Sequence, residues 1–293
     1  MGEYAVMHGA DAICMPLETG QELLVVEREG TDIHWKWSYE DRLLADFYLE
    51  KESLEPYSIE VGDPQWVINL IQYIRLQNPQ FLKKEVAHLH FVNHFPPQWG
   101  LGSSAATISS LCRLASVNPY LVNQKLMGGS GADIACTTAE NWFLYRNKMP
   151  RPLTWDIPVK YQFQQNTFFV YSGRKQQTAA HLQDVKKNTG SLPGVSWQHA
   201  NDFVYRFIAA ATLPELLKII YEHELLISDK IKMEPVGNQF PDFPGKIKSL
   251  GAWGGDFFMA VSLQQSDFVK EYFRSRGYDS VFGWDEFMET EKF

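Results

Sequence analysis

Positive charge is in short supply in this chain of 293 residues. The 27 lysines and arginines are outnumbered by 35 aspartates and glutamates, which gives a formal net charge of −8 and an isoelectric point near 5.5. A general nucleic-acid-binding protein needs a basic surface, so this balance argues against one.

Cysteine is scarce as well. Cys14, Cys112 and Cys136 form no even set and no paired spacing typical of zinc sites, so they indicate reduced thiols rather than a disulfide framework. Long apolar runs are missing, because none approaches the ~20 residues of a membrane span. The first residues lack the basic, then apolar pattern of a secretory signal. We therefore expect a cytoplasmic protein with neither a membrane nor a nucleic acid as partner.

Glycine, in contrast, gathers in three segments. The first is Gly100-Leu101-Gly102-Ser103-Ser104-Ala105-Ala106, which leads into a run with helical periodicity. Glycine lets a backbone approach an anion closely, and the first turn of a helix leaves N–H donors for it. The two hydroxyls add hydrogen bonds, and one of them can bind a phosphate-bound Mg²⁺. We expect Asn118-Pro119 to end this helix.

Two more glycine-rich segments follow far along the chain. Gly128-Gly129-Ser130-Gly131-Ala132-Asp133 places a carboxylate behind a tight turn, and Gly251-Ala252-Trp253-Gly254-Gly255-Asp256 lies near the other end. A lone glycine-serine turn is usually an ordinary loop. Three such segments, each beside an apolar run, predict one phosphate-binding site assembled from distant loops.

These segments resemble the motifs of the GHMP kinases, a family named for galactokinase, homoserine kinase, mevalonate kinase and phosphomevalonate kinase. Pro96-Pro97-Gln98-Trp99 followed by the turn from Gly100 to Ala106 resembles the second motif. Gly2-Glu3-Tyr4-Ala5-Val6-Met7-His8-Gly9 resembles the first, and the Gly251 segment the third. Together the motifs span nearly the whole chain.

The resemblance implies an α+β protein. Its N-terminal domain would resemble domain 2 of ribosomal protein S5, and its C-terminal domain would be ferredoxin-like, with ATP between them. We place the boundary near residue 155, which gives domains 1–155 and 156–293. The pattern of residues predicts strands within 10–50 and at 86–92 and 167–171, strands flanking 251–262, and helices at 65–76, 179–187, 197–211, 214–228 and 267–276.

The resemblance also implies which residues bind ATP and Mg²⁺. The nucleotide would contact Pro97, Gly100, Leu101, Gly102, Ser103, Ser104 and Ala105, together with Gly251, Gly254 and Gly255. Ser104, or Ser103 in its place, would bind the Mg²⁺. The acceptor substrate would contact Glu3, Tyr4, His8, Ser130, Gly131 and Lys175. Arg174 and Lys175 are candidates for binding an anionic acceptor, and a solvated hairpin tip explains them equally well.

Asp133 is the expected catalytic residue, because it matches the aspartate of the family's Ser-Gly-x-Asp motif. It could accept the proton of an attacking hydroxyl or orient a nucleophile that is already an anion. A position near a helix start would favour the ionised carboxylate and make it a weak base. The alternative is a purely structural helix cap.

Three details resemble phosphomevalonate kinase more than mevalonate kinase. They are Gln124, where mevalonate kinases tend to carry a glutamate, the form of the 128–135 segment, and Gly254-Gly255-Asp256. The chain also resembles a GHMP branch marked by Gly-x-Asp-Ile-Ala, for which no acceptor is established. The acceptor therefore stays open among phosphomevalonate-like, mevalonate-like and sugar compounds.

Two departures from the family pattern bear on activity. Trp253 replaces a glycine of the third motif. Relatives also carry a strand and a charge-neutralising lysine before the Gly-Glu pair, whereas Met1 directly precedes Gly2 here. Either the sequence is a fragment or a catalytic cation has been lost. We favour a fragment, and we expect the chain as given to transfer phosphate poorly.

Two functions of different kinds follow. The first is a kinase that uses MgATP on a small acceptor, as a monomer or homodimer. The second is a nucleotide-binding relative, regulatory or impaired, that keeps the fold without turnover. His88 and His90 share one face of a predicted strand near His94, which would suit a metal pair, but no further ligands are evident in the sequence.

Overall fold

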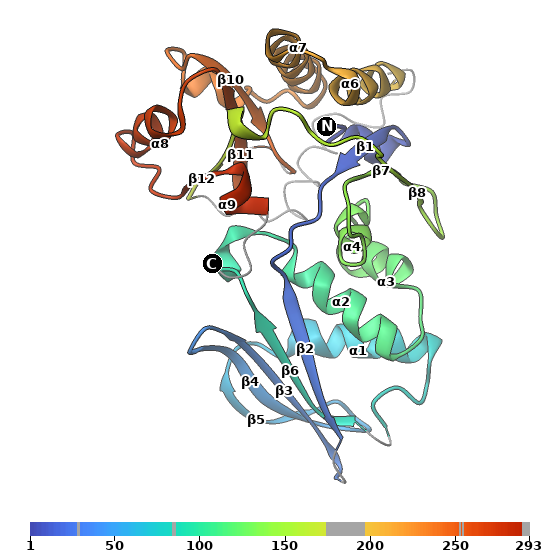
Figure 1. Ribbon diagram of the computed structural model, residues 1–293. Helices are drawn as coiled ribbons and strands as arrows, with labels where there is room; N and C mark the ends of the chain where they lie inside the picture. The colour runs from blue at the N-terminus through green and yellow to red at the C-terminus, as the bar shows by residue number, and fades with distance from the viewer. Residues whose placement is uncertain (28–29, 84–85, 174–196, 252, 254, 289–293) are drawn as a thin grey trace. The chain divides into compact units, whose positions relative to one another are not determined.

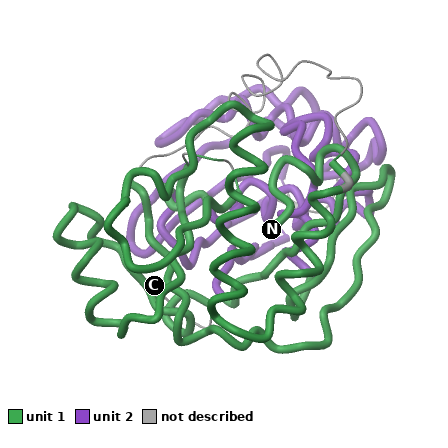
Figure 2. Tube along the Cα trace, turned by 90° about the horizontal axis from the view of Figure 1, so that it is seen from above, with its two compact units in different colours: residues 1–18, 98–100, 139–290 green, residues 19–97, 101–138, 291–293 purple. Residues whose placement is uncertain are grey.

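The computed structural model describes all residues except 28–29, 84–85, 174–196, 252, 254 and 289–293 (Figure 1). The chain divides into two compact units (Figure 2). Among the described residues, unit 1 contains those of 1–18, 98–100 and 139–288, and unit 2 contains those of 19–97 and 101–138. Residue 155 lies inside unit 1, and the division into domains at that point stays a prediction.

Unit 2 is built on a five-stranded sheet with the order β2-β6-β3-β4-β5. Its neighbours pair antiparallel except β3 and β6, which are parallel. The strands are β2 (Gln21–Glu27), β3 (Asp32–Tyr39), β4 (Arg42–Glu50), β5 (Pro56–Val61) and β6 (Val86–Asn93). The helices are α1 (Gln65–Gln77), α2 (Ser103–Leu114), α3 (Pro119–Leu126) and α4 (Ala132–Cys136).

The core of unit 2 lies between one face of this sheet and the helices. In β3, Ile33 and Trp35 are buried, while His34 and Lys36 between and after them are only partly buried, as expected of a strand with one covered face. The helices contribute residues such as Leu70, Ile108 and Ile134 to the same hydrophobic core. The helix that follows the glycine turn is therefore held against the sheet by its apolar side.

Unit 1 contains two smaller sheets. One has the order β1-β7-β8 and the other the order β10-β11-β9-β12. The strands are β1 (Asp11–Cys14), β7 (Phe143–Arg146), β8 (Leu153–Asp156), β9 (Thr167–Tyr171), β10 (Gly245–Ser249), β11 (Phe257–Ser262) and β12 (Val281–Gly283). The helices are α6 (Gln198–Ala209), α7 (Leu213–Ile231), α8 (Ser266–Arg274) and α9 (Trp284–Met288).

Short 3-10 turns complete the described chain. They are η1 (Ala5–His8), η2 (Pro97–Trp99), η3 (Gln164–Asn166) and η4 (Val236–Gln239). In unit 1, α8 buries Val269 and Phe273 against Phe258 and Ala260 of β11, which forms an aromatic-rich core. No helix among the described residues is long and apolar enough to cross a membrane.

Most of the predicted elements are confirmed where the structure describes them. The helices predicted at 65–76, 197–211, 214–228 and 267–276 correspond to α1, α6, α7 and α8, and the strands at 86–92 and 167–171 to β6 and β9. The helix predicted at 179–187 lies outside the described residues. The prediction that Asn118-Pro119 ends a helix is wrong: α2 ends at Leu114, and Asn118 instead caps α3 by accepting a hydrogen bond from Tyr120 N at 3.0 Å.

Candidate functional site

The glycine turn leads directly into α2, as predicted. Gly102 is the N-cap residue and adopts a left-handed conformation (φ 86°), which favours glycine. No side chain caps the helix, and its first intrahelical bond runs from Ala106 N to Gly102 O at 2.9 Å. The amides of Ser103, Ser104 and Ala105 therefore precede that bond and have no intrahelical acceptor. Both serines are partly exposed, so this end of α2 offers N–H and O–H donors suited to a phosphate.

Gly100, which belongs to unit 1, is required to be glycine for a second reason. It too is left-handed (φ 64°), and a Cβ atom there would overlap the carboxyl group of Asp256. The segment just before it is fixed within unit 1, because Trp99 packs edge-on against Phe257 and the Tyr171 hydroxyl donates to Gln98 O at 3.1 Å. The glycine-rich segment that begins at Gly100 and the one that begins at Gly251 therefore meet at the pair Gly100 and Asp256.

Asp133 lies in the first turn of α4 but does not cap it. The N-cap residue is Gly131 (φ 82°), and the Ser130 hydroxyl accepts a hydrogen bond from Ala132 N at 3.2 Å. The alternative that Asp133 is a structural helix cap is therefore wrong. The local turn is built by Ser130 and Gly131, which leaves the Asp133 carboxylate available for another role.

The start of α4 lies beside the start of α2. A Cβ atom built on Gly102 would be 4.0 Å from the Cβ of Asp133. The structure thus brings the predicted catalytic carboxylate to the predicted phosphate turn, within one unit, although 31 positions separate them in the sequence (133 − 102).

The electrostatics of Asp133 differ from the prediction. Its side chain reaches solvent, yet the protein around it desolvates the carboxylate and raises its pKa above the ordinary 3.8. Asp133 does lie at a helix start, as expected, but its pKa shifts upward through desolvation rather than downward. A carboxylate with a raised pKa is a stronger base than an ordinary aspartate.

The first motif packs against the third inside unit 1. Trp253 N donates to the Tyr4 hydroxyl at 2.9 Å, and the Trp253 side chain is buried with Tyr4, Ile227 and Ile231. Trp253, which stands where the family motif has a glycine, therefore packs into the hydrophobic core of unit 1, and its ring contacts α7. Burial raises the pKa of Tyr4 to about 12, so its hydroxyl stays neutral. Tyr4 and its neighbour Glu3 are both engaged in contacts within unit 1.

A buried cluster of charged residues lies beneath these two motifs, and sequence reasoning missed it. Lys248 of β10 donates to Glu3 Oε1 at 2.7 Å and lies 3.7 Å from Glu224 Oε1 of α7. His223 Nε2 accepts a hydrogen bond from Gly2 N at 3.3 Å. Burial acts to raise the pKa of the Glu3 carboxyl, but the positive charge of Lys248 prevails and holds that pKa well below its usual range. Burial raises the pKa of Glu224 to about 7.

The sequence carried little signal for this cluster. In β10, Lys246 and Lys248 alternate with Ile247, a pattern typical of a strand with one face in solvent. Lys246 fits that pattern, but Lys248 is 1% exposed. Lys248 is thus engaged by Glu3 in an ion pair inside unit 1.

Solved structures of small-molecule kinases have a similar fold over almost the full chain. Mevalonate kinase from L. major in complex with R-mevalonate has a TM-score of 0.66 at 14% identity, covering 97% of this chain and 91% of that one. Phosphomevalonate kinase from Streptococcus pneumoniae has a TM-score of 0.65 at 14% identity, with 96% and 95% covered. Lactococcus lactis galactokinase complexed with galactose has a TM-score of 0.60 at 13% identity, with 97% and 89% covered.

The chain has the GHMP kinase fold. No protein-family model and no curated protein matches the sequence.

Within this GHMP fold, the candidate residues fall into two groups. Unit 2 contains Pro97, Leu101 to Ala105, Ser130, Gly131 and Asp133. Unit 1 contains Glu3, Tyr4, His8, Gly100, Gly251 and Gly255. His8 is exposed and stacks on Trp197 with ring centroids 4.9 Å apart. Gly254, Arg174 and Lys175 lie outside the described residues. The sequence analysis predicted that the glycine-rich segments beginning at Gly100, Gly128 and Gly251 converge on one nucleotide, and this stays a prediction.

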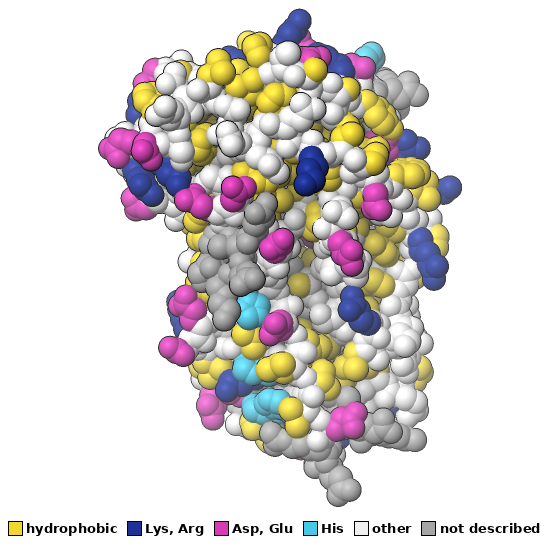
Figure 3. All heavy atoms as spheres, viewed as in Figure 1, with side chains coloured by type: hydrophobic (Ala, Val, Ile, Leu, Met, Phe, Trp, Pro, Cys, Tyr) yellow, Lys and Arg dark blue, Asp and Glu magenta, His cyan; other side chains and the backbone are white. Residues whose placement is uncertain are grey.

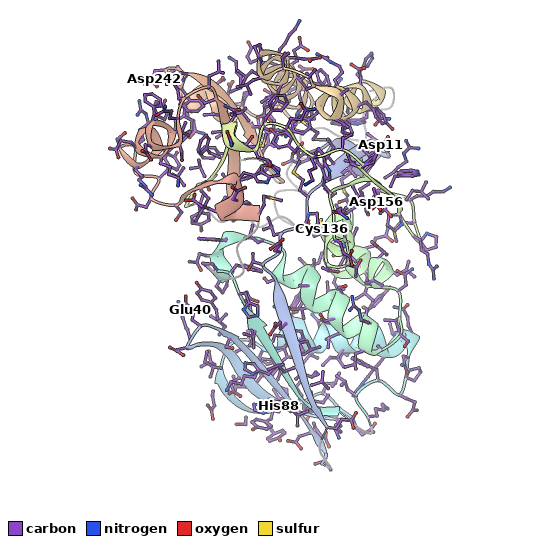
Figure 4. All side chains as sticks on the ribbon, in the orientation of Figure 1. Asp11, Glu40, His88, Cys136, Asp156 and Asp242 are labelled. Atoms are coloured by element: carbon purple, nitrogen blue, oxygen red, sulfur yellow. The ribbon has the colours of Figure 1, made fainter. Side chains whose placement is uncertain are left out.

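His34, His88 and His90 occupy positions in β3 and β6 that alternate with buried core residues, and His88 is labelled in Figure 4. Figure 3 shows histidine side chains close together on the face of the molecule in view. His88 Nδ1 lies 2.8 Å from His34 Nδ1, and His34 Nε2 lies 2.7 Å from Asp46 Oδ1. His90 Nε2 lies 2.8 Å from the Ser38 hydroxyl. Among the described residues, no group of three or more potential ligands is arranged for a metal ion, so this polar face is a hydrogen-bonded network.

Proposed function

We propose that this chain is an ATP-dependent small-molecule kinase of the GHMP family. It would transfer a phosphoryl group from MgATP to the hydroxyl or phosphate group of a small acceptor that is phosphomevalonate-like or mevalonate-like. The observation that carries this proposal is the position of Asp133 beside the Gly102 turn, at the uncapped start of α2. Phosphoryl transfer depends chiefly on positioning and on neutralising charge, and this pair of elements supplies both.

The donors at the turn fit a nucleotide phosphate. The amides of residues 103–105 would bind phosphate oxygens, and the helix dipole would favour the negative charge. The Ser104 hydroxyl, with Ser103 as the alternative, would bind Mg²⁺, which would bridge phosphate oxygens and neutralise charge that develops during transfer. Both serines are partly exposed, as such ligands must be.

Asp133 would act on the acceptor. Its raised pKa suits proton abstraction from a hydroxyl, because a base works best when its pKa approaches the working pH. If the acceptor is itself a phosphate anion, the same carboxyl would orient it, and the raised pKa would reduce repulsion between the two negative groups. The structural neighbours include kinases of both kinds of acceptor and of a sugar, so their likeness leaves the acceptor open.

The test is release of ADP in a coupled assay with mevalonate, phosphomevalonate and galactose as acceptors. We expect slow turnover with one of them, and Asp133→Asn to lower that kcat by a further factor of about 10²–10⁴ while ATP binding, followed by calorimetry, changes little. Asp41→Asn, an exposed aspartate of the same unit, is the matched control and should keep full activity. Ser104→Ala should weaken binding of MgATP more than binding of ATP without the metal.

The same assay distinguishes the kinase from the second candidate function, a nucleotide-binding relative without turnover. Binding of MgATP without turnover of any acceptor would identify a nucleotide-binding relative that has lost catalysis. Failure to bind MgATP would overturn both functions.

A further inference from the structure

Two hydroxyl groups join the helix of the phosphate turn to the helix of Asp133. Ser109 Oγ of α2 lies 2.7 Å from Thr137 Oγ1, which directly follows α4. Thr137 Oγ1 also donates to Ile134 O at 2.7 Å. A hydroxyl has only one proton, so Ser109 must donate to Thr137, and Thr137 to Ile134. The link is therefore directional and ends on the carbonyl of the residue next to Asp133.

Helix α4 needs such a link because it is short. Five residues form barely more than one turn, which is not stable on its own in water. Its orientation must come from tertiary contacts, and burial of Ile134 and Ala135 supplies one set. Figure 4 labels Cys136 at the end of this helix, next to Thr137 in the sequence. An apolar contact alone tolerates sliding, whereas a hydrogen bond between two side chains sets one position.

Two contacts between these helices lie at different points along them. At the starts of the helices, Gly102 lies beside Asp133. Further along, Ser109 meets Thr137. Thr137 is four positions after Asp133, so the two lie on the same side of the turn. Two contacts along the length of a helix prevent both sliding and rotation, while one would allow rotation.

We propose that Ser109 and Thr137 are positioning residues that hold Asp133 at the phosphate turn. Neither touches the reacting atoms; they act through the placement of α4. This inference rests on the proposed kinase function for its effect on turnover, and on the structure alone for its effect on the Asp133 carboxyl.

The test compares Thr137→Val, which keeps the shape and removes the hydroxyl, with Thr137→Ser, which keeps the hydroxyl. Thr138→Val is the matched control, because the Thr138 hydroxyl makes only a 3.4 Å bond within its own turn, to Ala135 O. Ser109→Ala removes the donor of the same hydrogen bond from α2, and it replaces Thr137→Val in the test if that variant does not fold. We expect Thr137→Val and Ser109→Ala to lower kcat about 10- to 100-fold, with KM for ATP within about threefold. Thr137→Ser and Thr138→Val should match the wild type.

A second measurement needs no turnover. The titration of the Asp133 carboxyl is followed by NMR with ¹³C-labelled aspartate, and Asp133→Asn assigns the signal. A loosened α4 lets water reach the carboxylate, so Thr137→Val should move the titration midpoint down by about half a pH unit or more. If no acceptor is turned over, the kinase proposal fails and this shift alone decides the positioning role.

Unchanged kcat together with an unchanged Asp133 titration in Thr137→Val would overturn the inference. The same holds if the variant only unfolds at a lower temperature, because the hydroxyl pair would then contribute to stability alone.

Discussion

The carboxyl of Asp133 combines solvent access with a pKa raised by desolvation. If the carboxylate acts as a base, only its deprotonated form is active, so activity falls as the pH drops through its pKa. We therefore expect the acidic limb of the kcat/KM profile to lie above the ordinary aspartate pKa of 3.8. The measurement is the rate between pH 4 and 8, with folding checked by circular dichroism at each pH. A limb at or below the ordinary value would contradict this role.

Glu224 gives a prediction about stability. Its pKa is about 7 in the folded protein against an ordinary value of 4.5. A raised carboxyl pKa means that the folded state favours the protonated form, so this contribution is fully present below about pH 4.5 and is lost as the pH rises through about 7. Glu224→Gln stays neutral and should remove that decline, which is at most about 3 kcal/mol.

The measurement for Glu224 is urea unfolding at pH 5, 6, 7 and 8. Glu271→Gln, an exposed glutamate of the same unit, should keep the wild-type slope. Parallel curves for the wild type and Glu224→Gln would show that Lys248 holds Glu224 ionised throughout this range.

Gly100 tests the contact between two of the motifs. Gly100→Ala introduces a left-handed alanine and a clash with the Asp256 carboxyl. Gly277→Ala, in the same unit, has the same type of backbone (φ 85°) and open space around it. We expect Gly277→Ala to cost about 1 kcal/mol of unfolding free energy and Gly100→Ala about 2–4 kcal/mol. Equal losses in thermal or urea unfolding would mean that Asp256 moves aside freely.

Single residues differ in how much the sequence reveals about them. The turn around Gly102 follows from local rules, because glycine and serine spacing determines where a helix can begin, whereas Asp133 was singled out by its match to the Ser-Gly-x-Asp motif of the GHMP kinases. The raised pKa of Asp133 does not follow, since desolvation depends on atoms from distant segments. Burial of Lys248 against Glu3 joins residues 245 positions apart, which no local pattern indicates.

At the scale of elements, α2 is anchored to the sheet by a chain of side-chain hydrogen bonds. Thr107 of α2 donates to Gln21 Oε1 at 2.9 Å, and Gln21 Nε2 donates to Asn93 Oδ1 at 2.8 Å. The Asn93 oxygen also accepts from Trp37 Nε1 at 3.1 Å. These bonds connect α2, β2, β6 and β3 beneath the phosphate turn.

Removal of the middle residue should therefore be costly. Gln21→Leu leaves the buried Thr107 hydroxyl without its acceptor, and we expect a loss of about 1–3 kcal/mol in unfolding free energy. Gln65→Leu is the matched control, because Gln65 makes an exposed bond to Asn69 within α1, so the change should stay within about 0.5 kcal/mol. Similar denaturation midpoints for the two variants would argue against an anchoring role.

Elements with a clear period were predictable, and short ones were not. Helix α1 repeats buried residues on one side, and β3 alternates along its length, so both appear in the sequence pattern. The pair Asn118-Pro119 was ambiguous, because the same residues that end one helix also favour the start of the next. Strands of three or four residues, such as β7, β8 and β12, are too short to display a period.

For the whole molecule, the division into two compact units predicts independent folding of unit 2. Its sheet and α1–α4 share one hydrophobic core, whose buried residues all lie between 33 and 134 and against which Leu23 packs. We expect a fragment of residues 19–138 to give a dispersed NMR spectrum and a cooperative unfolding transition. Equally strong protection of α1 amides from hydrogen exchange in the fragment and in the full chain would support this. A collapsed fragment without fixed structure would contradict it.

The course of the chain between units was not predictable from composition. The first 18 residues belong with residues 139–290, and β1 pairs with β7, so that Asp11 faces Arg146. Such pairing of distant segments depends on the topology of the fold. An inspection of the sequence alone places a domain boundary where a polar turn occurs, as near residue 155. The GHMP resemblance correctly implied the α+β fold because its motifs carry information on the whole chain.

Three features lie at fixed angles around the axis of helix α2. They are the turn at Gly102, the hydrogen bond of Thr107 to Gln21 and the hydrogen bond of Ser109 to Thr137. One inserted residue between Ser103 and Thr107 would rotate everything after it by about 100°. The anchor and the donor would then point away from Gln21 and Thr137 together. Length variation in this sequence should accordingly be excluded from this stretch of α2.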